Sequence, residues 1–588
     1  MKRMLACLLT VCLLLSCCVF GVAADDAEKT GVMVTDVTWD GANQPKPGAK
    51  VVFSAHLTNN GTAAVTEAVS VALYVNQEKV FTQNYDKGIA AGKTVQVKFP
   101  KWEAVAGEHV ITVAINDTQP ERFNWVDKQH LPVNIRVADK ALEVPEIAKK
   151  YGMTKLTFSD DFTTLDTVDQ ACTGAYGYKW YANVPYGAAD ALPTDYVLTD
   201  DGMSVQRVPT LFNWALCTFD CDTGAGWGFK HGYMEIRFRT PGHRLSGTSG
   251  KPAVWSLPPE KILSLPDLQD HYIETDFLEF FGDDIYSTTL HDLHFTNKHC
   301  NEYIRWDKNS NNEYMGLRDD KWHTLSFVRQ NGLMRSYLDG KEYMALYWED
   351  GKKPYPEATS LKGGDGVSAF AHVDNQLTPI VLSGGEGWPL EVDYITVWEG
   401  DKEANQGESV ETAQFIDTYL RDDEGQINLT PDFESYETLM DMETAFLELP
   451  EKQQEELNRL AKREVGKTMA QVIGDAKQFK TDMEAFVAAF AVDSEGALLD
   501  TESVDACKVI VKGERKWNKM SAELKEAVNN YVYLNNGTMY EDLLAAAREK
   551  VPASPIKPLM IVAVIAVIAV GVAIVIPCKK CCKKTKEE

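Results

Sequence analysis

The chain has 588 residues, and its 59 Lys and Arg against 86 Asp and Glu give a formal net charge of −27. This length exceeds what a single hydrophobic core supports, so we expect several domains. Such an acidic chain is repelled by polyphosphate, which argues against nucleic acid as a partner. Hydrophobic residues at 44% and aromatic residues at 10% exclude wholesale disorder.

Residues 1–24 have the features of a secretory signal peptide. Lys2 and Arg3 precede an apolar run, and the small residues Ala23 and Ala24 close it. This order of basic, apolar and small residues is typical of a cleaved leader, and a retained anchor helix is the alternative interpretation. The sequence therefore predicts export.

Residues 31–137 consist of short alternating runs that are typical of β-strands. Turns rich in Asn and Gly separate these runs, which predicts a small Ig-like β-sandwich. The stretches Leu57-Thr58-Asn59-Asn60-Gly61 and Ile89-Ala90-Ala91-Gly92-Lys93 resemble the bacterial CARDB-type module. That resemblance implies a spacer or a weak contact with carbohydrate or protein, and we see no catalytic constellation in this region.

The run from Tyr272 to Phe281 predicts a strand that carries three carboxylates. Alternation places Glu274 and Asp276 on one face, whereas a regular strand would turn Glu279 to the other face. One extra residue near Phe277-Leu278, a β-bulge, would return Glu279 to the carboxylate face. Crowded carboxylates raise at least one pKa, and glycoside hydrolysis needs one ionised and one protonated carboxyl. A charged edge strand is the alternative interpretation.

The motif Glu274-Thr275-Asp276-Phe277-Leu278-Glu279 resembles the catalytic strand of glycoside hydrolase family 16, the β-jelly-roll group that includes laminarinases. Four further motifs within residues 148–402, two before the catalytic motif and two after it, resemble motifs of the family and occur in the same order. They are Phe158-Ser159-Asp160-Asp161-Phe162 with Lys179-Trp180, His231–Arg239, Trp322–Gly340, and Val392–Trp398. The resemblance implies a concanavalin-like jelly roll. It also implies that Glu274 is the nucleophile, that Glu279 is general acid and then base, and that Asp276 assists both. The implied reaction is a two-step displacement that retains the anomeric configuration.

Four more residues are candidates for binding the glycan: Trp255, His291, His294 and Lys251. Trp255 offers an indole face for sugar stacking, with core packing as the alternative. His291 and His294 share a strand face and could hydrogen-bond the glycan, but they lack the third ligand of a zinc site. Lys251 stands where family laminarinases often carry Trp, and it suits an acidic or sulfated glycan or else is a solvated loop lysine. The sequence predicts no cofactor and no metal site, and leaves a structural calcium ion open.

Residues 405–552 are rich in Ala, Glu, Lys and Leu with helical periodicity. Phe415 and the turn Asp422–Gly425 recur 71 positions later as Phe486 and Asp493–Gly496. We therefore predict two tandem helical modules, at 405–481 and 482–552, that act as a stalk or as a binding module. The acidic turns lack the spacing of a calcium loop.

The C-terminus carries an uncharged apolar run at 559–577, followed by a lysine-rich tail at 578–588. This pattern predicts a single transmembrane helix, with the ectodomain extracellular and the C-terminus cytoplasmic. Outside the cell, four cysteines could pair in three ways or remain thiols: Cys172, Cys217, Cys221 and Cys300.

The sequence thus favours a multidomain protein with a β-sandwich, a β-jelly roll, an α-helical tandem repeat and one membrane helix. The leading hypothesis for its function is a cell-surface endo-acting retaining glycosidase. Its substrate would be a β-linked polysaccharide, either like β-1,3-glucan or a galactan, a sulfated glycan or a host glycan. The alternative is a non-catalytic carbohydrate-binding adhesin on the same scaffold. The sequence identifies no protein partner.

Overall fold

The computed structural model describes residues 31–551 with internal gaps. The gaps are 117–131, 184–194, 206–214, 243–250, 264–270, 281–285, 295–298, 307–316, 318–319, 350, 358–359, 362–373, 375 and 386. Contacts divide the chain into two compact units, Met1–Ile427 with Leu449–Glu464, and Asn428–Glu448 with Val465–Glu588.

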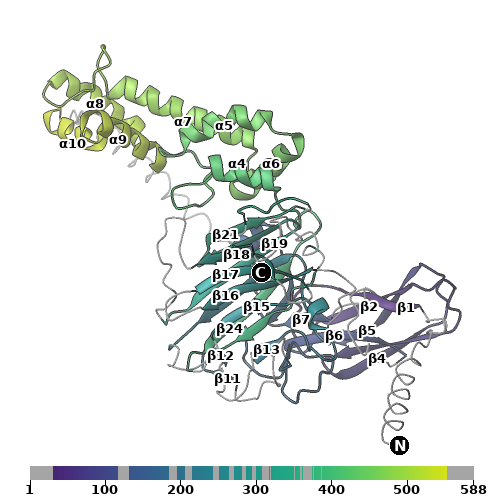
Figure 1. The fold of residues 1–588 in the computed structure, drawn as a ribbon. Helices are drawn as coiled ribbons and strands as arrows, with labels where there is room; N and C mark the ends of the chain where they lie inside the picture. The colour runs from purple at the N-terminus through teal and green to yellow at the C-terminus, as the bar shows by residue number, and fades with distance from the viewer. Residues whose placement is uncertain are drawn as a thin grey trace, which may run out of the picture. The chain divides into compact units, whose positions relative to one another are not determined.

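The N-terminal domain of the first unit is a sandwich of two antiparallel sheets (Figure 1). The three-stranded sheet has the order β1 (Val32–Asp40), β2 (Lys50–Asn59) and β5 (Thr94–Glu103). The four-stranded sheet has the order β4 (Glu78–Tyr85), β3 (Val69–Val75), β6 (Gly107–Ile115) and β7 (Val133–Val137). Alternate apolar residues of both sheets, among them Phe53, Val71 and Ile111, form the core between them.

The middle domain contains two larger sheets. One has nine described strands in the order β22 (Ser360–Leu361), β18 (His299–Trp306), β17 (Tyr286–His294), β16 (His271–Phe280), β15 (Ala253–Ser256), β23 (Val381–Ser383), β13 (Ala215–Cys217), β10 (Trp180–Tyr181) and β9 (Val168–Asp169). The other has the order β11 (Tyr196–Thr199), β12 (Gly202–Val205), β24 (Leu390–Glu399), β14 (Gly232–Arg239), β19 (His323–Gln330), β20 (Leu333–Leu338) and β21 (Lys341–Tyr347), with β8 (Lys155–Asp160) also paired to β24.

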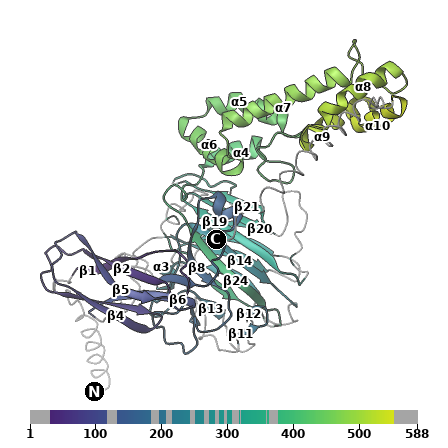
Figure 2. The same ribbon diagram turned by 180° about the vertical axis from the view of Figure 1, so that it is seen from behind.

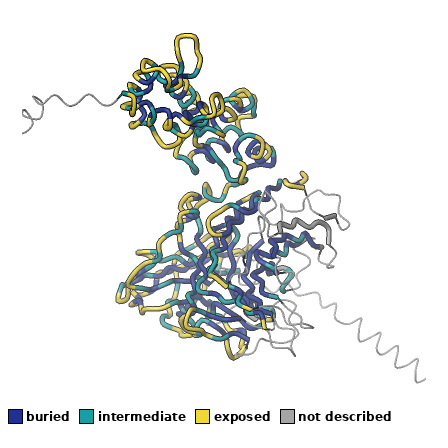
Figure 3. Tube along the Cα trace, turned by 90° about the vertical axis from the view of Figure 1, so that its left-hand side faces the viewer, coloured by how far each residue is buried: buried dark blue, intermediate teal, exposed yellow. Residues whose placement is uncertain are grey.

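The two sheets of the middle domain enclose one apolar core. Phe277 and Leu290 enter it from the nine-stranded sheet, and Ile236, Phe327 and Ile395 enter it from the other. Seen from behind, β14, β24, β19 and β20 run side by side across the second sheet (Figure 2). Continuous buried stretches follow the strands of the middle domain, and many exposed residues lie at turns and loops (Figure 3). The β-sandwich and jelly-roll parts of the predicted fold class are therefore confirmed.

The described helices are α2 (Glu146–Lys150), α3 (Pro259–Ile262), α4 (Val410–Tyr419), α5 (Tyr436–Glu448), α6 (Glu451–Val465), α7 (Met469–Phe490), α8 (Val504–Trp517), α9 (Ala522–Asn536) and α10 (Tyr540–Lys550). Two pairs of helices in the C-terminal part, α6 with α9 and α7 with α10, begin at the predicted spacing of 71 residues. Both ends of α9, and the start of α10, lie 71 residues after those of α6 and α7. Gly466 and Gly537, which follow α6 and α9, both have positive φ, at 71° and 75°. The helical repeat is thus present in the backbone, while its boundaries at 405–481 and 482–552 stay a prediction.

No helix among the described residues is long and apolar enough to cross a membrane. Only α7, with 22 residues, exceeds 15 residues among the described helices, and it carries five charged side chains: Asp475, Lys477, Lys480, Asp482 and Glu484. This finding overturns the single transmembrane helix of the predicted fold class and, with it, the predicted localisation as a single-pass membrane protein. The segments behind those predictions, 1–24, 559–577 and 578–588, lie outside the described residues.

Candidate active site

The three predicted carboxylates lie on β16, near the middle of the nine-stranded sheet (Figure 1). Along β16 the chain advances three residues from Asp276 to Glu279, while its partner β17 advances two, from Thr289 to Ser287. One residue of β16 is therefore extra at this point. The predicted β-bulge is confirmed, and it returns Glu279 to the face of Asp276.

Core packing explains why the bulge falls where it does. Phe277 and Leu278 are consecutive in sequence, and both are buried in the core between the two sheets. A regular strand would place one of them on the opposite face. Because both apolar side chains enter the core, the carboxylates before and after them stay together on the other face.

Glu274, Asp276 and His291 form a tight cluster. Two carboxylate oxygens and an imidazole nitrogen of these residues all lie within 4.8 Å of one another. His291 comes from β17, directly opposite Glu274, and its Nε2 is 3.0 Å from Asp276 Oδ2. The side chain of Asp276 is only 7% exposed and that of His291 is 15% exposed, so the hydrogen bond between them is shielded from water.

Burial and mutual repulsion shift the protonation of this cluster. Burial first, then the charges of Asp276 and Glu279, raise the pKa of Glu274 to about 8, against the opposing effects of His291 and Lys261. Burial and the charge of Asp276 also raise the pKa of Glu279, while Lys251 lowers it. Since neighbouring carboxyls titrate together, the group holds at least one proton at neutral pH.

Two lysines flank the carboxylates. Lys251, just before β15, places its Nζ 2.5 Å from Glu279 Oε1, with 29% of the lysine side chain and 17% of the glutamate side chain exposed. Lys261, in α3, lies with its Nζ 5.1 Å from the ring centroid of Tyr272 and acts electrostatically on Glu274. Sequence reasoning found Lys251 but missed Lys261. Lys261 could have been predicted from its position, because it lies in the connection between β15 and β16, and this connection leads into the strand that carries the carboxylates.

The same cluster could in principle share a cation, since Glu274, Asp276 and His291 all offer ligand atoms. Carboxylates also cluster in proteins without a metal, and the hydrogen bond from His291 to Asp276 by itself explains why these two side chains lie close together. We therefore assign no metal to this site.

The other predicted binding residues lie on the same sheet. Trp255 pairs with Asp276 across β15 and β16, is 6% exposed, and donates a hydrogen bond from Nε1 to Ser383 Oγ at 2.8 Å. It packs in a second apolar cluster with Tyr272 and Leu293. This burial favours core packing over a fully open stacking platform. His294 ends β17, opposite His271 in the backbone register, and its side chain lies outside the described residues.

The opening motifs of the middle domain also come together. Asp160, at the end of β8, accepts hydrogen bonds from Trp180 Nε1 and Thr167 Oγ1, both at 2.9 Å. The fully buried Lys179 donates to the backbone oxygen of Ser159. These residues, distant in sequence, thus tie the first strand of the domain to the edge of the nine-stranded sheet.

Residues 33–120 match the CARDB family. The chain has an N-terminal CARDB domain. The predicted resemblance is confirmed at the level of fold: a CARDB domain precedes a middle domain with a jelly-roll architecture. A search of curated proteins finds no match to the sequence.

Solved structures similar to the chain include three glycosidases. A non-specific endo-β-1,3(4)-glucanase from family GH16 is 17% identical, with 45% of this chain and 95% of that chain covered and a TM-score of 0.29. An endo-β-galactosidase from Clostridium perfringens that releases GlcNAcα1-4Gal is 17% identical, with 44% and 66% covered and a TM-score of 0.30. A protein from work on endo-acting O-glycanases of the human gut microbiota is 15% identical, with 46% and 98% covered and a TM-score of 0.28. At these identities and scores, the three likenesses carry no argument about activity.

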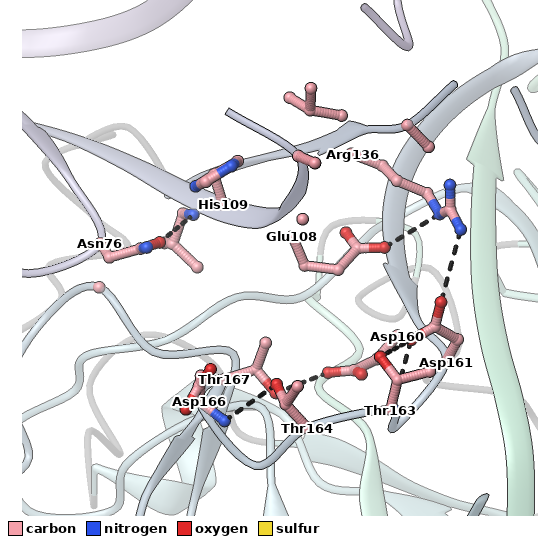
Figure 4. Close-up of a pocket in the computed structure, with 16 residues that line it drawn as sticks. Asn76, Glu108, His109, Arg136, Asp160, Asp161, Thr163, Thr164, Asp166 and Thr167 are labelled. Carbon is pink, nitrogen blue, oxygen red and sulfur yellow. Dashed lines mark hydrogen bonds and ion pairs between the residues drawn. The ribbon is translucent and has the colours of Figure 1, made fainter. Parts of the chain in front are cut away.

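A separate cavity of about 370 Å³ lies between the CARDB domain and the start of the middle domain (Figure 4). Glu108 and Arg136 of the CARDB domain face Asp160 and Asp161 across it. Arg136 Nε is 3.2 Å from Glu108 Oε1, and Arg136 Nη2 is 3.4 Å from Asp161 Oδ2. The cavity is thus lined by ion pairs that join the two domains, and it contains none of the predicted site residues.

Three of the four cysteines that could have formed disulfides have described side chains. Cys172, Cys217 and Cys221 form no disulfide within the described part of the chain, and Cys217 is buried among apolar residues. The side chain of Cys300 lies outside the described residues.

Proposed function

We propose that this protein is an endo-acting glycoside hydrolase that cleaves a β-linked polysaccharide with retention of configuration. The observation that carries the proposal is the gathering of Glu274, Asp276 and Glu279 on one face of β16 by a β-bulge. Burial, together with the charge of Asp276, raises the pKa of both glutamic acids. Glycoside hydrolysis makes use of this arrangement, because it needs a carboxylate and a carboxylic acid on either side of one bond.

In the first step, ionised Glu274 attacks the anomeric carbon while Glu279 gives its proton to the leaving oxygen. The bond between the anomeric carbon and that oxygen breaks, and a covalent glycosyl ester forms on Glu274. The leaving sugar departs with the proton, so Glu279 is left as a carboxylate.

In the second step, Glu279 removes a proton from water as that water attacks the same carbon. The ester bond breaks, Glu274 returns as a carboxylate, and Glu279 is again protonated. Two inversions at one carbon give net retention.

Asp276 and His291 support these steps from beside the reacting groups. The charge of Asp276 raises the pKa of both glutamic acids, which favours a protonated acid at neutral pH. The hydrogen bond from His291 at 3.0 Å fixes the orientation of Asp276. Trp255, buried beside Asp276, would support the strand that carries the carboxylates, and His294 would contact a neighbouring sugar.

The test uses the full chain with the variants Glu274→Gln and Glu279→Gln. We expect each to lower kcat/KM by about 10³-fold or more on whichever of laminarin, lichenan, agar, carrageenan or mucin glycans the wild type cleaves. With an aryl glycoside of good leaving ability, Glu279→Gln should still form the covalent intermediate, because that leaving group needs no proton. Glu274→Gln should not.

The matched control is Glu357→Gln, since Glu357 is an exposed carboxylate whose partner Lys353 is 3.7 Å away. It should retain wild-type activity. Activity of Glu274→Gln equal to the wild type, or an inverted anomer as the first product in NMR, would refute the mechanism. Binding without cleavage of any of these glycans would support the adhesin alternative instead.

A further inference from the structure

The ion pair between Lys251 and Glu279 conflicts with the chemistry proposed for Glu279. A general acid must hold a proton when the glycosidic bond breaks. Lys251 Nζ lies 2.5 Å from Glu279 Oε1, and a cation at this distance stabilises the carboxylate rather than the acid. Burial and the charge of Asp276 raise the pKa of Glu279, and Lys251 opposes them by lowering it, so the contact favours the ionised form of Glu279 in the resting state.

The proton of the cluster is then found on the other glutamic acid. Burial and the charge of Asp276 raise the pKa of Glu274 to about 8, so Glu274 is the group that holds a proton at neutral pH. Displacement needs the reverse distribution, with Glu274 ionised and Glu279 protonated. The resting site must move one proton from Glu274 to Glu279 before it can react.

Among the described residues, the charged groups that act on Glu279 are few. Asp276 and Glu274 lie on its own strand, His291 acts on it electrostatically from β17, opposite Glu274, and Lys251 precedes β15. The Lys251 side chain is 29% exposed, more than those of His291 and Asp276 at 15% and 7%, and it is long and flexible. It is therefore the group that an arriving substrate can most readily draw away.

We propose that Lys251 makes this site selective for anionic glycans, because a sulfate or carboxylate on the substrate takes over its ammonium group and releases Glu279 to accept the proton from Glu274. The inference rests on the proposed function and names its substrate class. A neutral glycan leaves the ion pair intact, so the acid stays ionised. Lys261, which acts on Glu274 from α3, adds a second cation to this face in a chain with a formal net charge of −27.

The experiment compares laminarin with sulfated laminarin, and agarose oligosaccharides with κ-carrageenan, on the full chain. We expect wild-type kcat/KM to be about tenfold higher on the sulfated member of a pair, equivalent to about 1.4 kcal/mol. The high-pH limb of kcat, which reports ionisation in the enzyme–substrate complex, should also lie at higher pH with the sulfated substrate. Lys251→Met should lose the preference and give the same high-pH limb with both substrates, whereas Lys251→Arg should keep the preference.

Lys353→Met is the matched control, since it removes one exposed lysine elsewhere in the domain and should change neither the preference nor the pH profile. A sulfate preference that persists in Lys251→Met, or a wild type that prefers the neutral member, would overturn the inference. If Glu274→Gln and Glu279→Gln match the wild type, the proposed function itself fails.

A binding measurement keeps the inference testable without turnover. In the Glu274→Gln background, calorimetry should give about tenfold weaker binding of sulfated laminarin oligosaccharides when Lys251→Met is added, with the neutral oligosaccharides unaffected. Equal weakening for both would show that Lys251 recognises no anion.

Discussion

At Glu274, burial and the neighbouring charge of Asp276 raise the pKa of the carboxyl to about 8. An unfolded chain would ionise the same group near its ordinary value of 4.5. The folded state therefore binds more protons than the unfolded state, and stability is lost as pH rises between these two values. The burial that suits this carboxyl to catalysis therefore lowers the stability of the folded protein at high pH.

Glu274→Gln should consequently stabilise the protein, and more so at high pH. Each pKa unit corresponds to about 1.4 kcal/mol. We expect the variant to gain little at pH 5 and about 2–4 kcal/mol at pH 9, because there the wild type must bury a charge that glutamine lacks. Denaturant unfolding at the two pH values measures the difference. Glu78→Gln, an exposed change on β4, should show no such trend, and a gain that shrinks as pH rises would contradict the argument.

At the scale of elements, a buried ionic network fastens β20 and β21 to α4 and α6. Glu408, just before α4, is 3.1 Å from Arg335 of β20 and 2.9 Å from Arg463 of α6, and its side chain is 1% exposed. Burial alone would raise the pKa of Glu408, but the charges and hydrogen bonds of Arg463 and Arg335 outweigh it and lower the pKa to about 2. The carboxylate is thus held ionised within the protein.

Glu408→Gln should destabilise this unit by about 3–5 kcal/mol at pH 7, because it leaves two buried guanidinium groups without their shared anion. The folded pKa is depressed, so the loss should be complete above pH 4.5 and should shrink as pH falls towards 2. Denaturant unfolding across this range measures it. Glu411→Gln, which removes the half-exposed pair with Lys352 at 2.8 Å, should cost at most about 1 kcal/mol. Equal losses for the two variants would argue against the network.

The elements differ in how far the sequence could predict them. The bulge was predictable, because alternation fixed two carboxylates on one face and a third needed one extra residue to join them. The helical repeat was predictable from its spacing of 71 residues. The network around Glu408 was not, since its arginines lie 73 and 55 residues away and only the tertiary fold brings them together. Lys251 was predicted from its position as a residue that binds the glycan, but its contact with Glu279 was not, because that contact depends on how the chain enters β15.

For the first unit as a whole, a buried cation joins the CARDB domain to the middle domain. Lys179 of the middle domain is fully buried, with its Nζ 2.7 Å from Glu108 Oε2 on β6. Ser159 Oγ also donates to Glu108, at 2.9 Å. A paired charge at such a boundary penalises separation of the domains, because separation would leave one of the charges without its partner.

Lys179→Met should therefore uncouple the two domains. Heating the wild type should unfold the CARDB domain and the middle domain together, and the variant should show an earlier, separate transition for the CARDB domain in calorimetry. Lys98→Met removes an exposed pair with Asp40 at 3.6 Å and should leave the profile unchanged. A single unshifted transition in Lys179→Met would mean that this ion pair does not couple the domains.

The bulge in β16 has a consequence for how this site can change over time. Along a strand, the side of the sheet on which a residue lies depends on whether its count from a reference is odd or even. Substitutions at Phe277 or Leu278 can alter size and packing, yet none of them changes that parity. Only the insertion or deletion of one residue between Asp276 and Glu279 changes that parity, and it would move the Glu279 side chain to the opposite face of the sheet. Point substitutions therefore leave both glutamic acids on the same face of the sheet, and only a change in the number of residues between them can separate them.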